Sequence, residues 1–115
     1  MADADVAVVG AGPAGAAAAA RLAKLGMRVV LLDQHSFPRD KVCGDFVSPV
    51  SLVELEDLGL ARLSGYLASN VARSATVFLE GQRALSHSLP AVPSLPDHGR
   101  VIPRVHLDAW IVEAA

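Results

Sequence analysis

A glycine-rich turn near the N-terminus constrains this chain more than any other feature. Gly10, Gly12 and Gly15 fall at the spacing G-x-G-x-x-G, directly after the apolar run at residues 6–9. An unbroken apolar run that is rich in β-branched valine predicts a parallel strand that is covered on both faces. The first glycine permits a tight turn, the second lets a phosphate approach the backbone, and the third lets a helix lie close to the strand. The spacing therefore predicts a strand, a turn and a helix in that order.

The residues that follow the turn strengthen this prediction. Pro13 stands where a helix begins, and the strong helix formers at residues 16–25 end at Gly26. Residues 27–32 predict a second buried strand, which ends on Asp33. A carboxylate there can accept hydrogen bonds from an adenosine ribose, while the helix N-terminus offers N–H groups to a phosphate. The sequence therefore predicts a βαβ unit that binds a dinucleotide.

Composition and charge exclude several other classes of protein. A net charge of −2 and 4% aromatic residues give no footprint for nucleic acid. Cys43 is the single cysteine, so an internal disulfide or a thiolate metal cluster is excluded, and a reducing cytoplasm is expected. The four histidines lack metal-ligand spacing, which predicts no metal site. The apolar N-terminus is led by Asp3 and Asp5, unlike an export signal, and it is too short for a membrane span.

A long connection follows the second predicted strand. Residues 35–49 show neither helix nor strand periodicity, and long connections in compact domains are often functional. Arg39 and Lys41 come soon after Asp33, on the side of the sheet where a dinucleotide would lie. A solvated charged loop would account for these two cations equally well.

Weaker patterns predict the remaining elements. They are a helix at residues 50–58 capped by Ser48 and ended by Gly59, a hairpin at 75–79 and 82–89, an extended piece at 101–105, and a helix at 106–115 whose face carries Leu107, Trp110, Ile111 and Ala114. Residues 60–74 stay ambiguous. Two parallel strands cannot bury themselves, and the apolar face of the last helix reaches the C-terminus unpartnered. We therefore expect residues 1–115 to be the N-terminal part of a longer protein.

Several motifs together resemble one family of flavoproteins. They are the glycine turn, Asp33, the run at residues 37–45, the pair Ser48 and Pro49, and the run at residues 104–110. These resemble the geranylgeranyl reductase family, a branch of the FAD-dependent oxidoreductases built like p-hydroxybenzoate hydroxylase. The pattern P-R-x-K-x-C-G within residues 38–44 is the most specific of them, and the resemblance spans essentially the whole chain.

The resemblance implies a fold and a set of cofactor-binding residues. The expected fold is α/β, a Rossmann-like βαβ FAD-binding unit with an added small β-hairpin and an incomplete sheet, and with the substrate domain absent. The residues that would wrap the FAD pyrophosphate are Gly10, Gly12, Ala14 and Gly15, and Asp33 would hold the ribose. Arg39 would lie on the dinucleotide side. The flavin side would be lined by Cys43 and Gly44, and Arg104 would contact FAD.

The resemblance also implies a chemistry. Relatives with this version of the cysteine-glycine motif reduce isoprenoid double bonds of quinones or lipids, with NAD(P)H as a candidate electron donor. The longer protein would be a cytoplasmic enzyme and a candidate for peripheral membrane association. A flavin performs its own hydride chemistry, so we identify no catalytic side chain. The family's later Gly-Asp motif and its substrate-binding sheet lie outside this sequence, so we expect the 115 residues alone to be inactive.

Three alternatives stay open at the level of sequence. A flavin-dependent monooxygenase or halogenase would share the glycine turn and the later arginine. A truncated, non-catalytic fragment would bind adenine nucleotides weakly or not at all. An NAD dehydrogenase would place a third parallel strand soon after Asp33, and residues 37–49 do not look like one.

Overall fold

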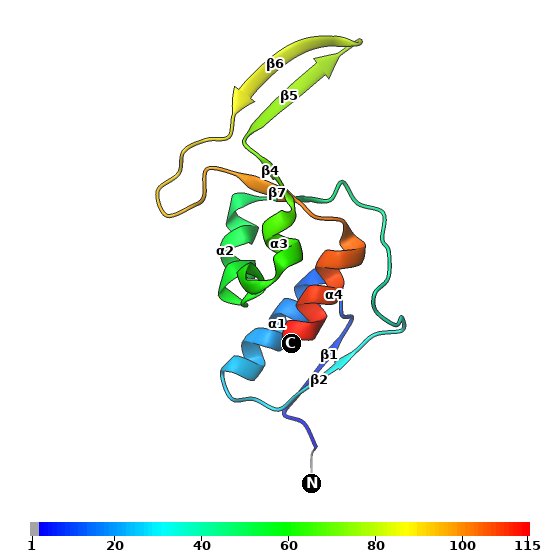
Figure 1. The fold of residues 1–115 in the computed structure, drawn as a ribbon. Coiled ribbons are helices and arrows are strands. Elements are labelled where there is room, and N and C mark those ends of the chain that lie inside the picture. Colours follow the sequence, from blue (N-terminus) through cyan, green and yellow to red (C-terminus); the bar gives the residue numbers. More distant parts are fainter. Residues whose placement is uncertain (1–2) are drawn as a thin grey trace.

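The chain begins with a parallel βαβ unit in the computed structural model, which describes residues 3–115 (Figure 1). β1 (Val6–Val9) leads through α1 (Pro13–Lys24) to β2 (Val29–Leu32). The two strands pair in parallel, from Val6 opposite Val29 to Val9 opposite Leu32. The α/β class and the order of strand, helix and strand confirm the fold predicted from the glycine spacing.

Only one face of this two-stranded sheet is covered, which corrects the prediction of strands buried on both faces. Val9 is 82% exposed and Leu32 is 50% exposed, whereas Val8 and Leu31 are partly buried on the side of α1. The apolar run therefore predicted the strand correctly, but its prediction that both faces of the strand are buried was wrong. Within residues 3–115, no element covers the outward face on which Val9 and Leu32 lie.

A second, antiparallel sheet has the strand order β3-β7-β4. These strands are β3 (Phe46–Val47), β7 (Gly99–Val101) and β4 (Asn70–Ala72). We expected no strand in residues 35–49, whereas the structure has β3 there. The sequence does not show β3 because two residues are too few for an alternating pattern. In residues 3–115 no third parallel strand follows β2, contrary to what an NAD dehydrogenase would show.

Three short helical segments pack beside this sheet. They are α2 (Pro49–Asp57), η1 (Leu60–Arg62) and α3 (Ser64–Ala68). The Ser48 hydroxyl accepts a hydrogen bond from the Ser51 amide at 3.3 Å, which confirms the predicted cap. Gly59 has φ +96° and ends α2 as predicted. The ambiguous residues 60–74 therefore contain η1, α3 and β4.

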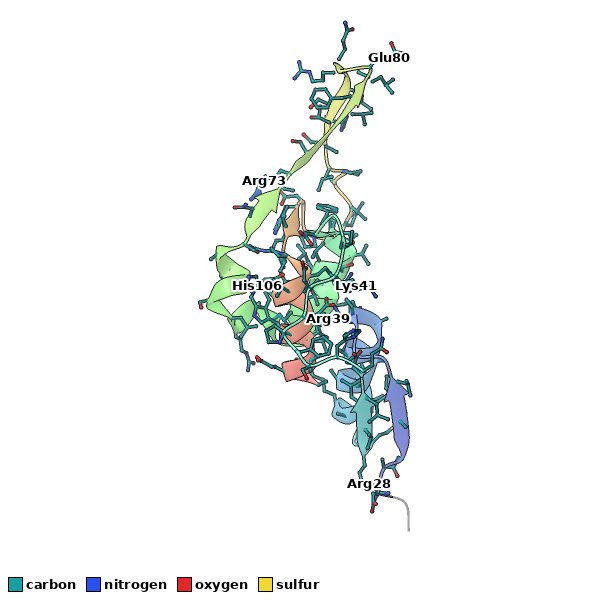
Figure 2. All side chains as sticks on the ribbon, turned by 90° about the vertical axis from the view of Figure 1, so that its right-hand side faces the viewer. Arg28, Arg39, Lys41, Arg73, Glu80 and His106 are labelled. Atoms are coloured by element: carbon teal, nitrogen blue, oxygen red, sulfur yellow. The ribbon has the colours of Figure 1, made fainter. Side chains whose placement is uncertain are left out.

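The predicted hairpin is present and projects from the rest of the molecule (Figure 1). It pairs β5 (Ser74–Leu79) with β6 (Gln82–Ser88), and Glu80 lies at its tip (Figure 2). Glu80 and Gly81 have φ of 50° and 78°, as a two-residue turn with both central residues in the left-handed region requires. The projection gives the molecule a length of 62 Å against widths of 31 and 23 Å.

The core lies where α1 and α4 (Arg104–Ala114) meet α2, η1 and α3. Small residues of α1, including Ala16 and Ala20, let α4 approach closely. α4 begins at Arg104 rather than at the predicted His106, because the extended segment already ends at Pro103. Its buried residues are Leu107, Asp108 and Ile111, whereas Ala114, predicted on the apolar face, is exposed.

No helix within residues 3–115 is both long enough and apolar enough to cross a membrane.

Candidate functional site

The glycine turn joins β1 to α1 with the geometry that its spacing predicts. Gly10 has φ +100°, and its N–H donates to the Leu32 carbonyl at 2.7 Å, which fastens the turn to the end of β2. A Cβ added at Gly15 would lie 1.8 Å from the Gly10 carbonyl oxygen. Glycine is therefore required at position 15 for α1 to approach the turn this closely.

The N-terminus of α1 opens beside this turn without a side-chain cap. Gly12 is the N-cap residue, and Pro13 follows at the first helical position. Within the described residues, no side chain accepts a hydrogen bond from the first-turn amides of Ala14 and Gly15. The first turn of α1 also contains no acidic residue. Uncapped amides and the partial positive charge of the helix end form a suitable place for a phosphate group.

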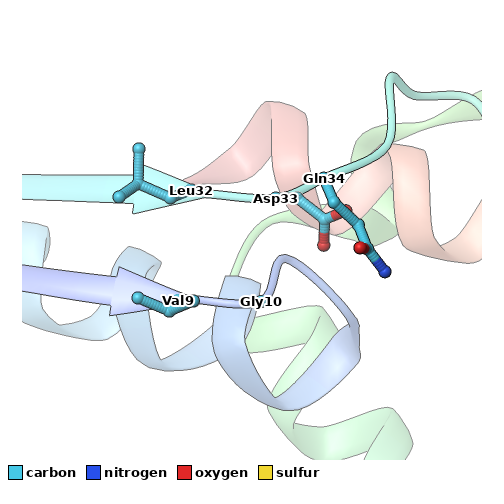
Figure 3. A pocket seen from close by; sticks show the side chains of 5 residues that line it. All are labelled: Val9, Gly10, Leu32, Asp33 and Gln34. Atoms are coloured by element: carbon cyan, nitrogen blue, oxygen red, sulfur yellow. The ribbon is translucent and has the colours of Figure 1, made fainter.

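Asp33 points toward the turn, as the sequence predicted. Its Oδ2 accepts the Ala11 N–H at 2.8 Å, and its Oδ1 accepts the His35 N–H at 2.8 Å. These backbone donors, first Ala11 and then His35, hold the pKa of the Asp33 carboxyl below its ordinary value. Figure 3 shows the carboxylate beside Gly10, at the edge of a cavity of about 360 Å³. The lining residues are Val9, Gly10, Leu32, Asp33 and Gln34.

Asp33→Asn should lower stability at neutral pH and change little in acid. A depressed folded-state pKa stabilises the fold above the unfolded value of about 4, and this contribution is lost as pH falls through the folded value. Thermal unfolding of both proteins at pH 7 and at pH 3 measures the difference. The difference between the two melting temperatures should be larger at pH 7 than at pH 3. An equal difference at both pH values would show that the carboxylate charge plays no part.

Arg39 reaches the glycine turn from the long connection after β2. Its Nη2 lies 3.8 Å from the position that a Cβ on Gly12 would occupy. Its Nη1 donates to Asp108 Oδ2 at 2.5 Å, and its guanidinium carbon lies 4.9 Å from the centre of the Phe37 ring. Figure 2 shows Arg39 in the middle of the molecule, in front of α4. The structure therefore brings Arg39 together with the predicted glycines.

Arg104 binds the same carboxylate from within α4. Its Nε donates to Asp108 Oδ1 at 2.7 Å and its Nη2 to Oδ2 at 2.9 Å. This pairing with Asp108 raises the pKa of Arg104 above its ordinary value. Sequence reasoning missed Asp108, which is fully buried. The signal that could have found it is an aspartate four residues after an arginine, beside the apolar positions of one helix.

Cys43 and Gly44 lie in an exposed loop. A hydrogen bond from the Asp45 backbone, with a smaller contribution from the Arg104 side chain, lowers the pKa of the Cys43 thiol. No atom lies within 4 Å of the place where a Cβ on Gly44 would be. The predicted site residues thus form two groups, the turn with Asp33 and Arg39, and Arg104 with Cys43. Asp108 connects the two groups through its bonds to both arginines.

Comparisons with known proteins agree with this geometry. A sequence profile described as FAD binding domain matches residues 3–115. The menaquinone reductase of Mycobacterium tuberculosis is 40% identical over 112 residues, which are 97% of this chain and 26% of that protein. The chain therefore spans about a quarter of the length of the menaquinone reductases that it matches.

Solved structures show the same architecture. A flavoprotein/dehydrogenase from Cytophaga hutchinsonii has a TM-score of 0.81 at 26% identity, over 96% of this chain and 27% of that one. CmlS, a flavin-dependent halogenase, has a TM-score of 0.81 at 31% identity, over 99% of this chain and 21% of that one.

Proposed function

Because this chain belongs to the family described as FAD binding domain, we propose that it is the nucleotide-binding N-terminal part of an FAD-dependent oxidoreductase. The observation that carries the proposal is the uncapped start of α1 beside Gly10, with the Asp33 carboxylate 2.8 Å from the Ala11 amide. When bound, FAD would supply the redox chemistry. The chain's own residues would bind and orient it.

Each residue of the turn has a distinct task in this proposal. The free amides of Ala14 and Gly15 donate to the pyrophosphate, and the absence of side chains at Gly10 and Gly12 lets it approach. Asp33 accepts hydrogen bonds from ribose hydroxyls, because each carboxylate oxygen keeps a lone pair after binding one amide. The cavity of about 360 Å³ beside Asp33 leaves room for the adenosine end.

We propose further that the whole enzyme reduces C=C bonds in the isoprenoid chain of a quinone or lipid, as the geranylgeranyl reductase family does. The support is the P-R-x-K-x-C-G pattern at residues 38–44 and the 40% identity to a menaquinone reductase over 97% of this chain. NAD(P)H is the proposed electron donor, and an isoprenoid substrate would bring the enzyme to a membrane surface. In this proposal residues 1–115 are one part of the enzyme, and the substrate-binding part follows them.

A second candidate is a flavin-dependent monooxygenase or halogenase. It is favoured by CmlS, whose structure covers 99% of this chain at a TM-score of 0.81. The two candidates share the nucleotide-binding part and differ in the substrate, so the turn does not discriminate between them.

Product analysis of the complete enzyme discriminates the two candidates. The full-length protein that contains this chain would be purified, its visible absorbance recorded, and NAD(P)H supplied with a menaquinone or with an aromatic substrate. We expect a yellow protein that saturates an isoprenoid double bond anaerobically. The second candidate would be favoured if the aromatic substrate is hydroxylated or halogenated in an oxygen-dependent reaction and the menaquinone is left unchanged. A colourless protein that takes up no added FAD would contradict both.

A further inference from the structure

We propose that Asp108 is a positioning residue, which holds the Arg39 guanidinium over the glycine turn so that its second nitrogen can receive the pyrophosphate. This inference rests on the proposed function, because it concerns how the same turn holds its dinucleotide. Asp108 itself would touch no part of the ligand, since its side chain is fully buried.

The first support is that both Asp108 oxygens are held by arginine. Arg104 takes them side-on, through Nε at 2.7 Å and Nη2 at 2.9 Å, from one turn earlier on α4. Such a two-point pairing fixes the plane of the carboxylate. The same Oδ2 then accepts Nη1 of Arg39 at 2.5 Å. The rigid helix α4 therefore sets the position of a side chain that comes from an irregular loop.

The second support is the direction in which Arg39 is held. With Nη1 on Asp108 and the guanidinium against the Phe37 ring, the other terminal nitrogen, Nη2, lies 3.8 Å from the Cβ position of Gly12. Gly12 is the N-cap of α1, where the uncapped amides begin. A loop arginine without such anchors would lose more side-chain entropy on binding an anion. Asp108 therefore holds the Arg39 guanidinium in its binding orientation before a ligand binds.

The third support is charge. One buried carboxylate lies between two guanidinium groups that are 14% and 15% exposed, which leaves one positive charge in excess. That charge adds to the partial positive charge of the α1 N-terminus. Two further carboxylates face this cluster: Asp33 attracts Arg39 electrostatically but accepts its hydrogen bonds from the backbone amides of Ala11 and His35, and Asp45 Oδ1 accepts the Arg104 backbone N–H at 3.3 Å. The excess charge is thus available to an anion at the turn.

The test compares a ligand that has phosphates with one that has none. The full-length protein that contains this chain, freed of any bound flavin, would be titrated calorimetrically with FAD, ADP and adenosine, as wild type, Asp108→Asn, Arg39→Met and the double variant. Asp108→Asn keeps the size of the side chain and one acceptor oxygen. Asp57→Asn is the matched control, because Asp57 pairs with Arg21 on the exposed surface between α1 and α2.

We expect Asp108→Asn to weaken ADP binding by roughly tenfold to a hundredfold, the range of one charge-assisted hydrogen bond, and to leave adenosine binding unchanged. In the Arg39→Met background the additional loss should vanish, because Asp108 acts through Arg39. Asp57→Asn should bind like wild type. Equal losses for ADP and adenosine, or additive losses in the double variant, would overturn the inference.

The wild-type chain provides a second measurement in case Asp108→Asn does not fold. The Nε–Hε signal of Arg39, assigned through Arg39→Lys, should show restricted motion and slow exchange without any ligand. A freely mobile Arg39 signal would overturn the inference. If wild type binds ADP and Asp108→Asn binds it equally well, only the inference is wrong. If wild type binds neither ADP nor FAD, the proposed function fails and the inference with it.

Discussion

Gly15→Val should destabilise the fold by about 3 kcal/mol, the upper end of ordinary overpacking. The added Cβ would lie 1.8 Å from the Gly10 carbonyl oxygen and 3.0 Å from its carbon. Both are backbone atoms of the turn, and the Gly10 amide is tied to Leu32, so the turn cannot move aside without losing that bond. α1 must then shift away from β1, and this shift also displaces the uncapped amides at the start of α1. Urea unfolding followed by circular dichroism measures the loss.

Gly44→Val is the matched control for this prediction. No atom lies within 4 Å of a Cβ at Gly44, so its free energy of unfolding should stay within about 0.5 kcal/mol of wild type. If the two valine variants unfold at the same urea concentration, close packing at Gly15 is not what holds α1 to the turn.

Asp108→Ala should cost about 3–5 kcal/mol, because removal of one partner of a buried ion pair leaves uncompensated charge. Here two guanidinium groups, Arg39 and Arg104, would be left facing each other with most of their surface removed from water. Small domains have total stabilities of about 5–15 kcal/mol, so a large fraction of the variant could be unfolded at 25 °C. The far-ultraviolet circular dichroism signal and the urea midpoint report this directly.

Asp57→Ala gives the comparison for an exposed ion pair. Asp57 pairs with Arg21, and the two side chains are 56% and 43% exposed. Water solvates both charges when the pair is broken, so we expect little change in the urea midpoint. A loss at Asp57 as large as that at Asp108 would mean that burial of the carboxylate does not determine its contribution.

Local patterns predicted most of the elements, because each carries its own signal. The glycine spacing predicted β1, α1 and β2. The pair of Ser48 and Pro49 predicted the start of α2, and the residues at 80–81 predicted the hairpin turn. Burial was predicted less well. The apolar residues of β1 indicate a strand, but whether a face is covered depends on elements elsewhere in the protein.

The geometry of the site could be predicted where one motif contains the parts concerned. Gly10, Gly15 and Asp33 belong to a spacing that specifies their geometry, and the structure places them together. Asp108 belongs to no such spacing with Arg39, from which it is 69 residues distant. Its role depends on α4 packing beside α1, a tertiary contact that no local pattern contains. The strand β3 was missed because its two residues are too few to alternate and because its partner β7 is distant in sequence.

If the first turn of α1 and Asp33 hold a dinucleotide, titration of the 115-residue chain with FAD should change the amide chemical shifts of these residues. We predict that the largest shifts fall on Gly10, Ala11, Gly12 and Ala14, with a second group at Asp33 and Gln34. Saturable shifts confined to the hairpin or to α2, or no shifts at all at millimolar FAD, would contradict dinucleotide binding at this turn.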